Sequence, residues 1–209
     1  VAIIIIGISA IIYAAGGIIT NPTNISFEDQ NLYNLMKRQL NSKKIAYNEN
    51  DVTKTIEISK DDVIKIEELN LQGTEDTQIA NLSGLENFTS LKSLDLTGNA
   101  IKEMASINNL GLEKLHLRAN PINQQILTSI TSMVSLNELN LTNTQMNGDQ
   151  LDNFSNLKNL KTLILANNNI SKLDEITPLI NLNKLDVSGN KSFTNFSQIT
   201  TLTELRELN

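Results

Sequence analysis

The chain contains no cysteine and no tryptophan, and it has a single histidine, His116, among 209 residues. The lack of cysteine excludes disulfides, thiolate metal ligands, cysteine nucleophiles and lipid attachment to a cysteine. One histidine leaves almost no material for a histidine-based metal site or catalytic dyad. The sequence also has no glycine-rich phosphate-binding loop. We therefore expect no enzymatic activity, no metal and no cofactor in this segment.

The chain also has no excess of basic residues over acidic ones. The chain has 17 Lys and Arg against 23 Asp and Glu, a net charge of −6 and a pI near 4.9. Phosphate binding needs a clustered basic patch, so we expect no nucleic-acid partner. The acidic residues are scattered through expected turns and coil surfaces rather than paired across a pocket. These observations leave a protein as the expected partner.

The pattern Leu-x-x-Leu-x-Leu-x-x-Asn-x-Ile recurs at intervals of 21 to 24 residues. Clear copies begin at Leu91, Leu112 and Leu160, and looser copies begin at Leu136 and Leu182. A period of this length with this spacing is the signature of leucine-rich repeats. The sequence therefore predicts an α/β leucine-rich-repeat solenoid over residues 66–209, with about six repeats, the last one truncated. The predicted solenoid is curved, with short parallel strands on its concave face and 3₁₀ turns or short helices on its convex face.

Within each copy the second and third Leu lie two residues apart, so both point into the core while their neighbours point outward. The Asn at the ninth position offers two donors and an acceptor to the backbone where the chain turns. We predict that Asn99, Asn120, Asn168 and Asn190 form a ladder from coil to coil. Thr144 takes the Asn place in one coil, and because a hydroxyl supplies one donor, we expect a looser turn there.

Beyond each turn, apolar residues at three-residue spacing predict a return along the convex side through a short helix or a 3₁₀ turn. The two 24-residue coils have the most room for a helix. The predicted convex core consists of Met104, Ile107, Leu110, Leu127, Ile130, Met133, Leu151, Phe154, Leu157, Leu173, Ile176, Leu179, Phe193, Phe196, Ile199 and Leu202.

Residues 1–20 carry no charge. A run of about 20 apolar residues is just long enough to cross a hydrocarbon layer as a helix. It stands where an export signal would stand, and small residues such as Ala14 and Gly16 could serve a cleavage site. We expect residues 1–20 to be a transmembrane anchor or a signal segment; a buried helix of the fold itself is the alternative.

Residues 21–25 contain Asn-Pro-Thr-Asn and are expected to be a linker, and residues 26–65 to be an N-terminal cap. Ser26 and Asp29 resemble a helix-start capping pair. Phe27, Leu32, Leu35, Met36 and Leu40 then fall on one face of a helix to about residue 41. Residues 53–59 alternate in the manner of a strand. Such a cap would keep water from the end of the repeat core.

The apolar start, the cap that begins with Phe27-Glu28-Asp29 and coils such as LSGLENFTSLKSLDLTGNAIKEM together resemble the internalin-type leucine-rich-repeat proteins of Gram-positive bacterial surfaces. The resemblance covers residues 26 to 209. It implies a module that binds another protein through its concave face. Two features depart from the family pattern: the coil lengths vary, and the concave face displays no aromatic residues.

The concave face is predicted from the residue between the second and third Leu of each coil. This central column is Asn70, Asp95, His116, Asn140, Ile164, Asp186 and Asn209, and a flanking column contains Arg118. Arginine is the one residue type favoured at binding hot spots that this face displays. We predict a partner-binding site formed by Asp95, His116, Arg118, Asn140, Ile164 and Asp186. A solvated strand face without a partner is the alternative.

Three functions are consistent with these patterns. The first is an exported, surface-attached or secreted protein-binding module, expected to be a monomer that contacts the membrane through residues 1–20 only. The second is an intracellular regulatory scaffold of the same repeat type. The third is a spacer that presents a further domain after Asn209. The apolar residues 1–20 favour the first.

Overall fold

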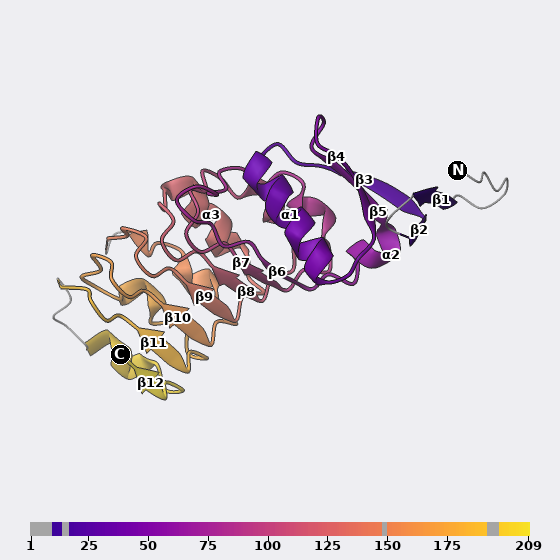
Figure 1. Ribbon diagram of the computed structural model, residues 1–209. Coiled ribbons are helices and arrows are strands. Elements are labelled where there is room, and N and C mark those ends of the chain that lie inside the picture. The colour runs from indigo at the N-terminus through magenta and orange to yellow at the C-terminus, as the bar shows by residue number, and fades with distance from the viewer. Residues whose placement is uncertain (1–9, 14–16, 148–149, 192–196) are drawn as a thin grey trace.

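Seven parallel strands stacked in chain order form the body of the protein. The computed structural model describes residues 10–13, 17–147, 150–191 and 197–209. The sheet has the order β12-β11-β10-β9-β8-β7-β6 and runs along the molecule, one strand per coil (Figure 1). Its strands are β6 (Glu68–Asn70), β7 (Ser93–Asp95), β8 (Lys114–His116), β9 (Glu138–Asn140), β10 (Thr162–Ile164), β11 (Lys184–Asp186) and β12 (Glu207–Leu208). The predicted solenoid is confirmed.

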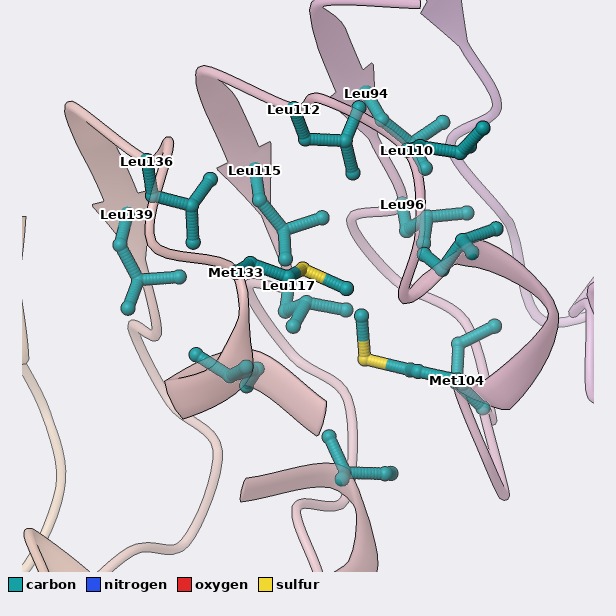
Figure 2. Close-up of a cluster of buried hydrophobic side chains, with 14 of the residues drawn as sticks. Leu94, Leu96, Met104, Leu110, Leu112, Leu115, Leu117, Met133, Leu136 and Leu139 are labelled. Carbon is teal, nitrogen blue, oxygen red and sulfur yellow. The ribbon is translucent and has the colours of Figure 1, made fainter. Parts of the chain in front are cut away.

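The repeated leucines form one continuous core. Leu94, Leu115 and Leu139 are paired in register on neighbouring strands, and each is at most 1 % exposed. Figure 2 shows these side chains leaving their strands on one side and meeting Met104 and Met133 from the opposite side of the coils. One coil cannot close such a core alone, because its leucines are covered by the coils before and after it.

The predicted asparagine ladder is present, and each rung joins two coils. The Asn120 side chain donates to the carbonyls of Leu96 and Leu117 at 2.8 and 3.1 Å, and its Oδ1 accepts the Ile101 amide. Asn99, Asn168 and Asn190 repeat this arrangement in their own coils. Buried turn groups that would otherwise lack partners are satisfied by one amide side chain per coil.

Thr144 takes the Asn place in its coil and supplies one hydroxyl donor instead of an amide side chain. Its hydroxyl donates to the Leu141 carbonyl at 2.8 Å. Asn168, in the next coil, makes an additional hydrogen bond to this turn: its Oδ1 accepts the backbone amides of both Thr144 and Met146, at 3.0 and 3.1 Å. The Ile122 side chain of the preceding coil is only partly buried.

The residue before each ladder position adopts a left-handed backbone conformation. Gly98 and Gly189 occupy it in two coils with φ of 74° and 71°. A Cβ on Gly98 would lie 2.8 Å from the Gly73 carbonyl oxygen, so this coil admits only glycine. Ala119, Asn143 and Asn167 occupy it elsewhere with φ of 55°, 55° and 56°. Ala119 lacks the polar side chain that eases this conformation in asparagine.

Ala119→Gly is therefore expected to stabilise the protein by about 0.5–1 kcal/mol, because the strain removed from a left-handed alanine exceeds the entropy that glycine adds to the unfolded chain. Chemical denaturation at equilibrium measures the difference. Ala105→Gly, in the 3₁₀ turn η2 (Ala105–Ile107), is the comparison and should not stabilise. A loss of stability in Ala119→Gly would contradict the strain argument.

The convex side carries short helical turns, as predicted. They are η1 (Leu85–Asn87), η2, η4 (Phe154–Asn156), η5 (Asp174–Ile176) and η6 (Ser197–Thr201), with one longer helix, α3 (Gln124–Ser132). The first 24-residue coil uses its extra length for the α-helix α3, and in the second the described convex residues include the 3₁₀ turn η4. Phe154 is buried as predicted, whereas Phe193 and Phe196 lie outside the described residues.

The cap combines one helix with a small antiparallel sheet. Helix α1 (Gln30–Ser42) buries the predicted face, including Leu32, Met36 and Leu40. It begins later than expected, because Asp29 and not Ser26 is its N-cap. The three-stranded sheet has the order β3-β5-β4, from β3 (Pro22–Ser26), β4 (Tyr47–Asn50) and β5 (Thr55–Ser59), and the short helix α2 (Lys60–Val63) follows.

The expected linker at residues 21–25 overlaps strand β3, which pairs with β5. Proline is compatible with this strand because Pro22 is its first residue and β3 lies at the sheet edge. The last residue of β3 is Ser26, so its backbone is committed to the sheet and the helix start moves to Asp29. The expected strand within residues 53–59 is confirmed as β5.

Residues 10–13 and 17–20, expected to be helical, form an antiparallel pair of strands, β1 (Ala10–Tyr13) and β2 (Gly17–Thr20). The rest of the apolar segment lies outside the described residues. Across residues 10–13, 17–147, 150–191 and 197–209, the structure has no helix with the length and apolar character needed to span a membrane. The assignment of residues 1–20 as an anchor or signal segment stays a prediction.

Candidate functional site

The outward side chains of β6–β12 form one surface, here called the strand face. The pairing places Asn70, Asp95, His116, Asn140, Ile164 and Asp186 in one column across six strands, as the sequence predicted. Arg118 lies in the adjacent column, where the ladder of backbone bonds continues past β8 through Gly98 N–H to Arg118 O. All six predicted site residues therefore share this face, although they do not converge on one pocket.

His116 lies between two carboxylates from neighbouring strands. Its Nε2 donates to Glu138 Oε1 at 2.9 Å, and its Nδ1 lies 3.8 Å from Asp95 Oδ2. The Asp95 carboxylate raises the pKa of His116 above its ordinary value of 6.5, against the lowering effect of partial burial. The Glu138 carboxylate raises this pKa further. Lys114 Nζ lies 3.6 Å from Glu138 Oε2, which extends the charged cluster along β8 and β9. Glu138 was not among the predicted site residues, because its contact with His116 runs diagonally between strands.

Three predicted site residues have a structural task. Asp95 Oδ1, Asn140 Oδ1 and Asp186 Oδ1 accept the backbone amide two residues ahead, at 2.9, 3.0 and 2.9 Å. These bonds hold the chain where it leaves each strand. Asp95 also accepts a bond from Gln72 Nε2 at 2.7 Å. Despite partial burial, the nearby His116 ring and the hydrogen bonds from Thr97 and Gln72 lower the pKa of Asp95 well below its usual range. The signal in the sequence was an Asx residue followed two places later by Ser or Thr.

Arg118 and Ile164 are held differently. The Arg118 side chain is exposed. Its guanidinium makes no hydrogen bond or ion pair with any residue that the structure describes. Ile164 is half-buried in a column of otherwise polar side chains, and Ala166 beside it is 5 % exposed. Among its described residues, the face therefore offers one free cation, Arg118, and a small apolar area at Ile164.

The single histidine allows a direct test of this geometry. The folded state binds the His116 proton more tightly than the unfolded state does, so His116 stabilises the fold below pH 6.5 and loses this contribution as the pH rises through its raised pKa. The stability difference between the native protein and His116→Gln should therefore shrink from pH 6 to pH 8. An NMR titration of the lone imidazole should give a pKa above 6.5, shifted downward in Glu138→Gln. A value at or below 6.5 in the native protein would contradict the carboxylate pairing.

Nothing in the described part of the chain groups three or more His, Asp or Glu side chains in a way that could hold a metal ion. The carboxylates near His116 are already engaged by Gln72, Thr97 and Lys114. The arrangement is suited to contact with another surface through charge, hydrogen bonds and a small apolar area.

No protein-family model and no curated protein matches the sequence. Solved structures do match the fold. Internalin C2 from Listeria monocytogenes str. 4b F2365 superposes with a TM-score of 0.72 at 24 % identity, over 88 % of this chain and 74 % of that chain. An internalin, InlF, from the same strain superposes with a TM-score of 0.69 at 26 % identity, over 87 % of this chain and 49 % of that chain. In its fold, the chain is an internalin-like leucine-rich-repeat protein.

Proposed function

We propose that the chain is a protein-recognition module that binds a partner through the strand face of β6–β12. The observation that carries this proposal is the in-register sheet, which presents two columns of outward side chains on a rigid and continuous core. A binding surface on regular strands is positioned by the packing beneath it, so it loses little conformational entropy when a partner docks. The internalin-like fold supports the same role.

The contact residues in this proposal are Asp95, His116, Arg118, Asn140, Ile164 and Asp186. Because Asp95, Asn140 and Asp186 also hold the strand ends, we assign the larger share of partner contact to His116, Arg118 and Ile164. Mixed polar and apolar character is usual at interfaces that form and separate. We place no catalytic step in this segment, and we propose that it acts as a monomer.

We further propose that the module is exported and displayed at the cell surface or secreted. The uncharged residues 1–20 support this location. Cell fractionation tests it: the protein should appear in the envelope or medium, and a soluble cytosolic pool alone would favour the intracellular scaffold.

The binding proposal is tested with two matched triple variants. His116→Ala, Arg118→Ala and Ile164→Ala together alter the strand face, whereas Gln124→Ala, Thr128→Ala and Asp152→Ala together alter exposed convex positions. Crosslinking to intact cells, followed by mass spectrometry, should give partner adducts with the native protein and the convex variant and few with the strand-face variant. Thermal melts check that both variants fold. Equal adducts from all three proteins would favour a spacer role or another surface.

A further inference from the structure

The charges around His116 are already balanced by the chain itself. Asp95 accepts bonds from Gln72 and from the Thr97 amide, and its other close neighbour is His116. Glu138 accepts from His116 at 2.9 Å and lies 3.6 Å from Lys114 Nζ. An incoming cation would have to displace these groups. Asp95 and Glu138 are therefore poorly suited to receive a basic partner.

Arg118 has the opposite situation. Its guanidinium is exposed, and within the described part of the chain it has no hydrogen-bond or ion-pair partner. The side chains beside it in the same column, on the neighbouring coils, are Thr97 and Thr142, which carry no charge. A guanidinium presents five donors in a planar fork that matches a carboxylate with two bonds. Arg118 is therefore available to bind an anionic group of a partner.

The apolar part of the face lies a short distance away. It is the half-buried side chain of Ile164 on β10, two strands beyond the coil of Arg118. Neighbouring strands lie about 4.8 Å apart, so Ile164 is about 10 Å from Arg118 across the strands. Asn140 and Thr142 lie between them and can offer hydrogen bonds to a backbone that crosses the strands.

Building on the recognition function proposed above, we propose that the strand face binds a peptide segment with an acidic side chain at Arg118 and an aliphatic or aromatic side chain at Ile164. A segment in the polyproline II conformation advances about 3.1 Å per residue with three residues per turn, so side chains three residues apart point to the same side and stand about 9 Å apart. The complementary charges and the apolar contact together define a motif that a partner protein would carry on an extended loop or tail.

The charged groups around the site add a dependence on conditions. Those facing His116 are Asp95 from β7, Glu138 from β9, and Lys114 and Arg118 from the β8 coil. Protonation of His116 makes this cluster more positive, so affinity for the acidic segment should rise as the pH falls toward 6. Added salt should weaken binding, because the Arg118 contact is exposed to solvent.

The probe is a library of random twelve-residue peptides displayed on phage and selected on the whole chain. Enriched peptides should place Asp or Glu about three residues from an aliphatic or aromatic residue. A synthetic enriched peptide, measured by fluorescence anisotropy, should bind Arg118→Gln about tenfold or more weakly, with partial recovery in Arg118→Lys. Ile164→Asn should also weaken binding. Arg38→Gln, at an exposed arginine on α1, should leave the affinity unchanged.

Thr162→Trp places a bulky side chain on the outward side of β10. This variant distinguishes recognition by the strand face in general from recognition of the acidic motif. Peptides that lose binding to Thr162→Trp but show no acidic preference, or that bind Arg118→Gln normally, overturn the acidic motif and leave recognition by the strand face intact. Peptides that bind Thr162→Trp as well as the native protein, or the absence of any enriched peptide, count against both proposals.

Discussion

Leu163→Ala is expected to lower the free energy of unfolding by about 2–5 kcal/mol. Leu163 lies in the middle of β10, it is fully buried, and Leu139 and Leu185 flank it in register. Truncation removes one methine and two methyl carbons from the core and leaves a cavity that three coils share. The backbone cannot collapse into this space easily, because both sides of β10 are held by the sheet.

Urea denaturation followed by circular dichroism measures this loss. Thr162→Ala, at the outward and half-buried neighbour on the same strand, is the matched control and should change stability by less than about 0.5 kcal/mol. An unaltered unfolding midpoint in Leu163→Ala would show that the leucine register does not form the core.

Asp29→Ala is expected to lower the free energy of unfolding by about 2–4 kcal/mol. Asp29 Oδ1 accepts the amides of Asn31 and Leu32 at 2.8 and 3.0 Å and so caps α1. Its Oδ2 accepts the amides of Ala80 and Asn81, in the first coil, at 2.8 and 3.2 Å. A single carboxylate therefore starts the helix and fastens it to the solenoid.

Asp29→Asn separates these two roles. The remaining Oδ1 can still cap α1, but the amide nitrogen that replaces Oδ2 would face two N–H donors of the first coil. Hydrogen exchange should therefore accelerate at Ala80 and Asn81 in both variants, and at Asn31 and Leu32 mainly in Asp29→Ala. Equal protection of all four amides in Asp29→Ala would refute the fastening role.

Most of the repeat geometry could be predicted from the sequence, because the same spacing of Leu and Asn recurs in coil after coil. The Leu spacing defines the inward positions of a strand, and the Asn places follow at a fixed distance, so Asn120 and Asn168 could be assigned their bonds before the structure. The face residues followed from the same register. Their partner-binding role is still a prediction.

The cap was less predictable because its contacts join residues far apart in the chain. Pairing between β3 and β5 brings Pro22 to Ser59, and no local pattern indicates it. The second role of Asp29 likewise depends on a coil 51 residues away. On the strand face, the bond between His116 and Glu138 depends on a diagonal reach between strands, which a column of aligned positions does not reveal.

The asparagine ladder makes most coils interchangeable modules for recombination. Each Asn completes the turn of the coil before it, so a duplicated or deleted unit that begins and ends at Asn positions restores every bond at the junction. The Thr144 coil is the exception, because its turn relies on the two amides that Asn168 accepts. Two such coils in tandem would place a Thr hydroxyl where the first coil needs the side-chain amide of an Asn. Gene duplication can therefore lengthen this array more readily at the asparagine-bearing coils than at the Thr144 coil.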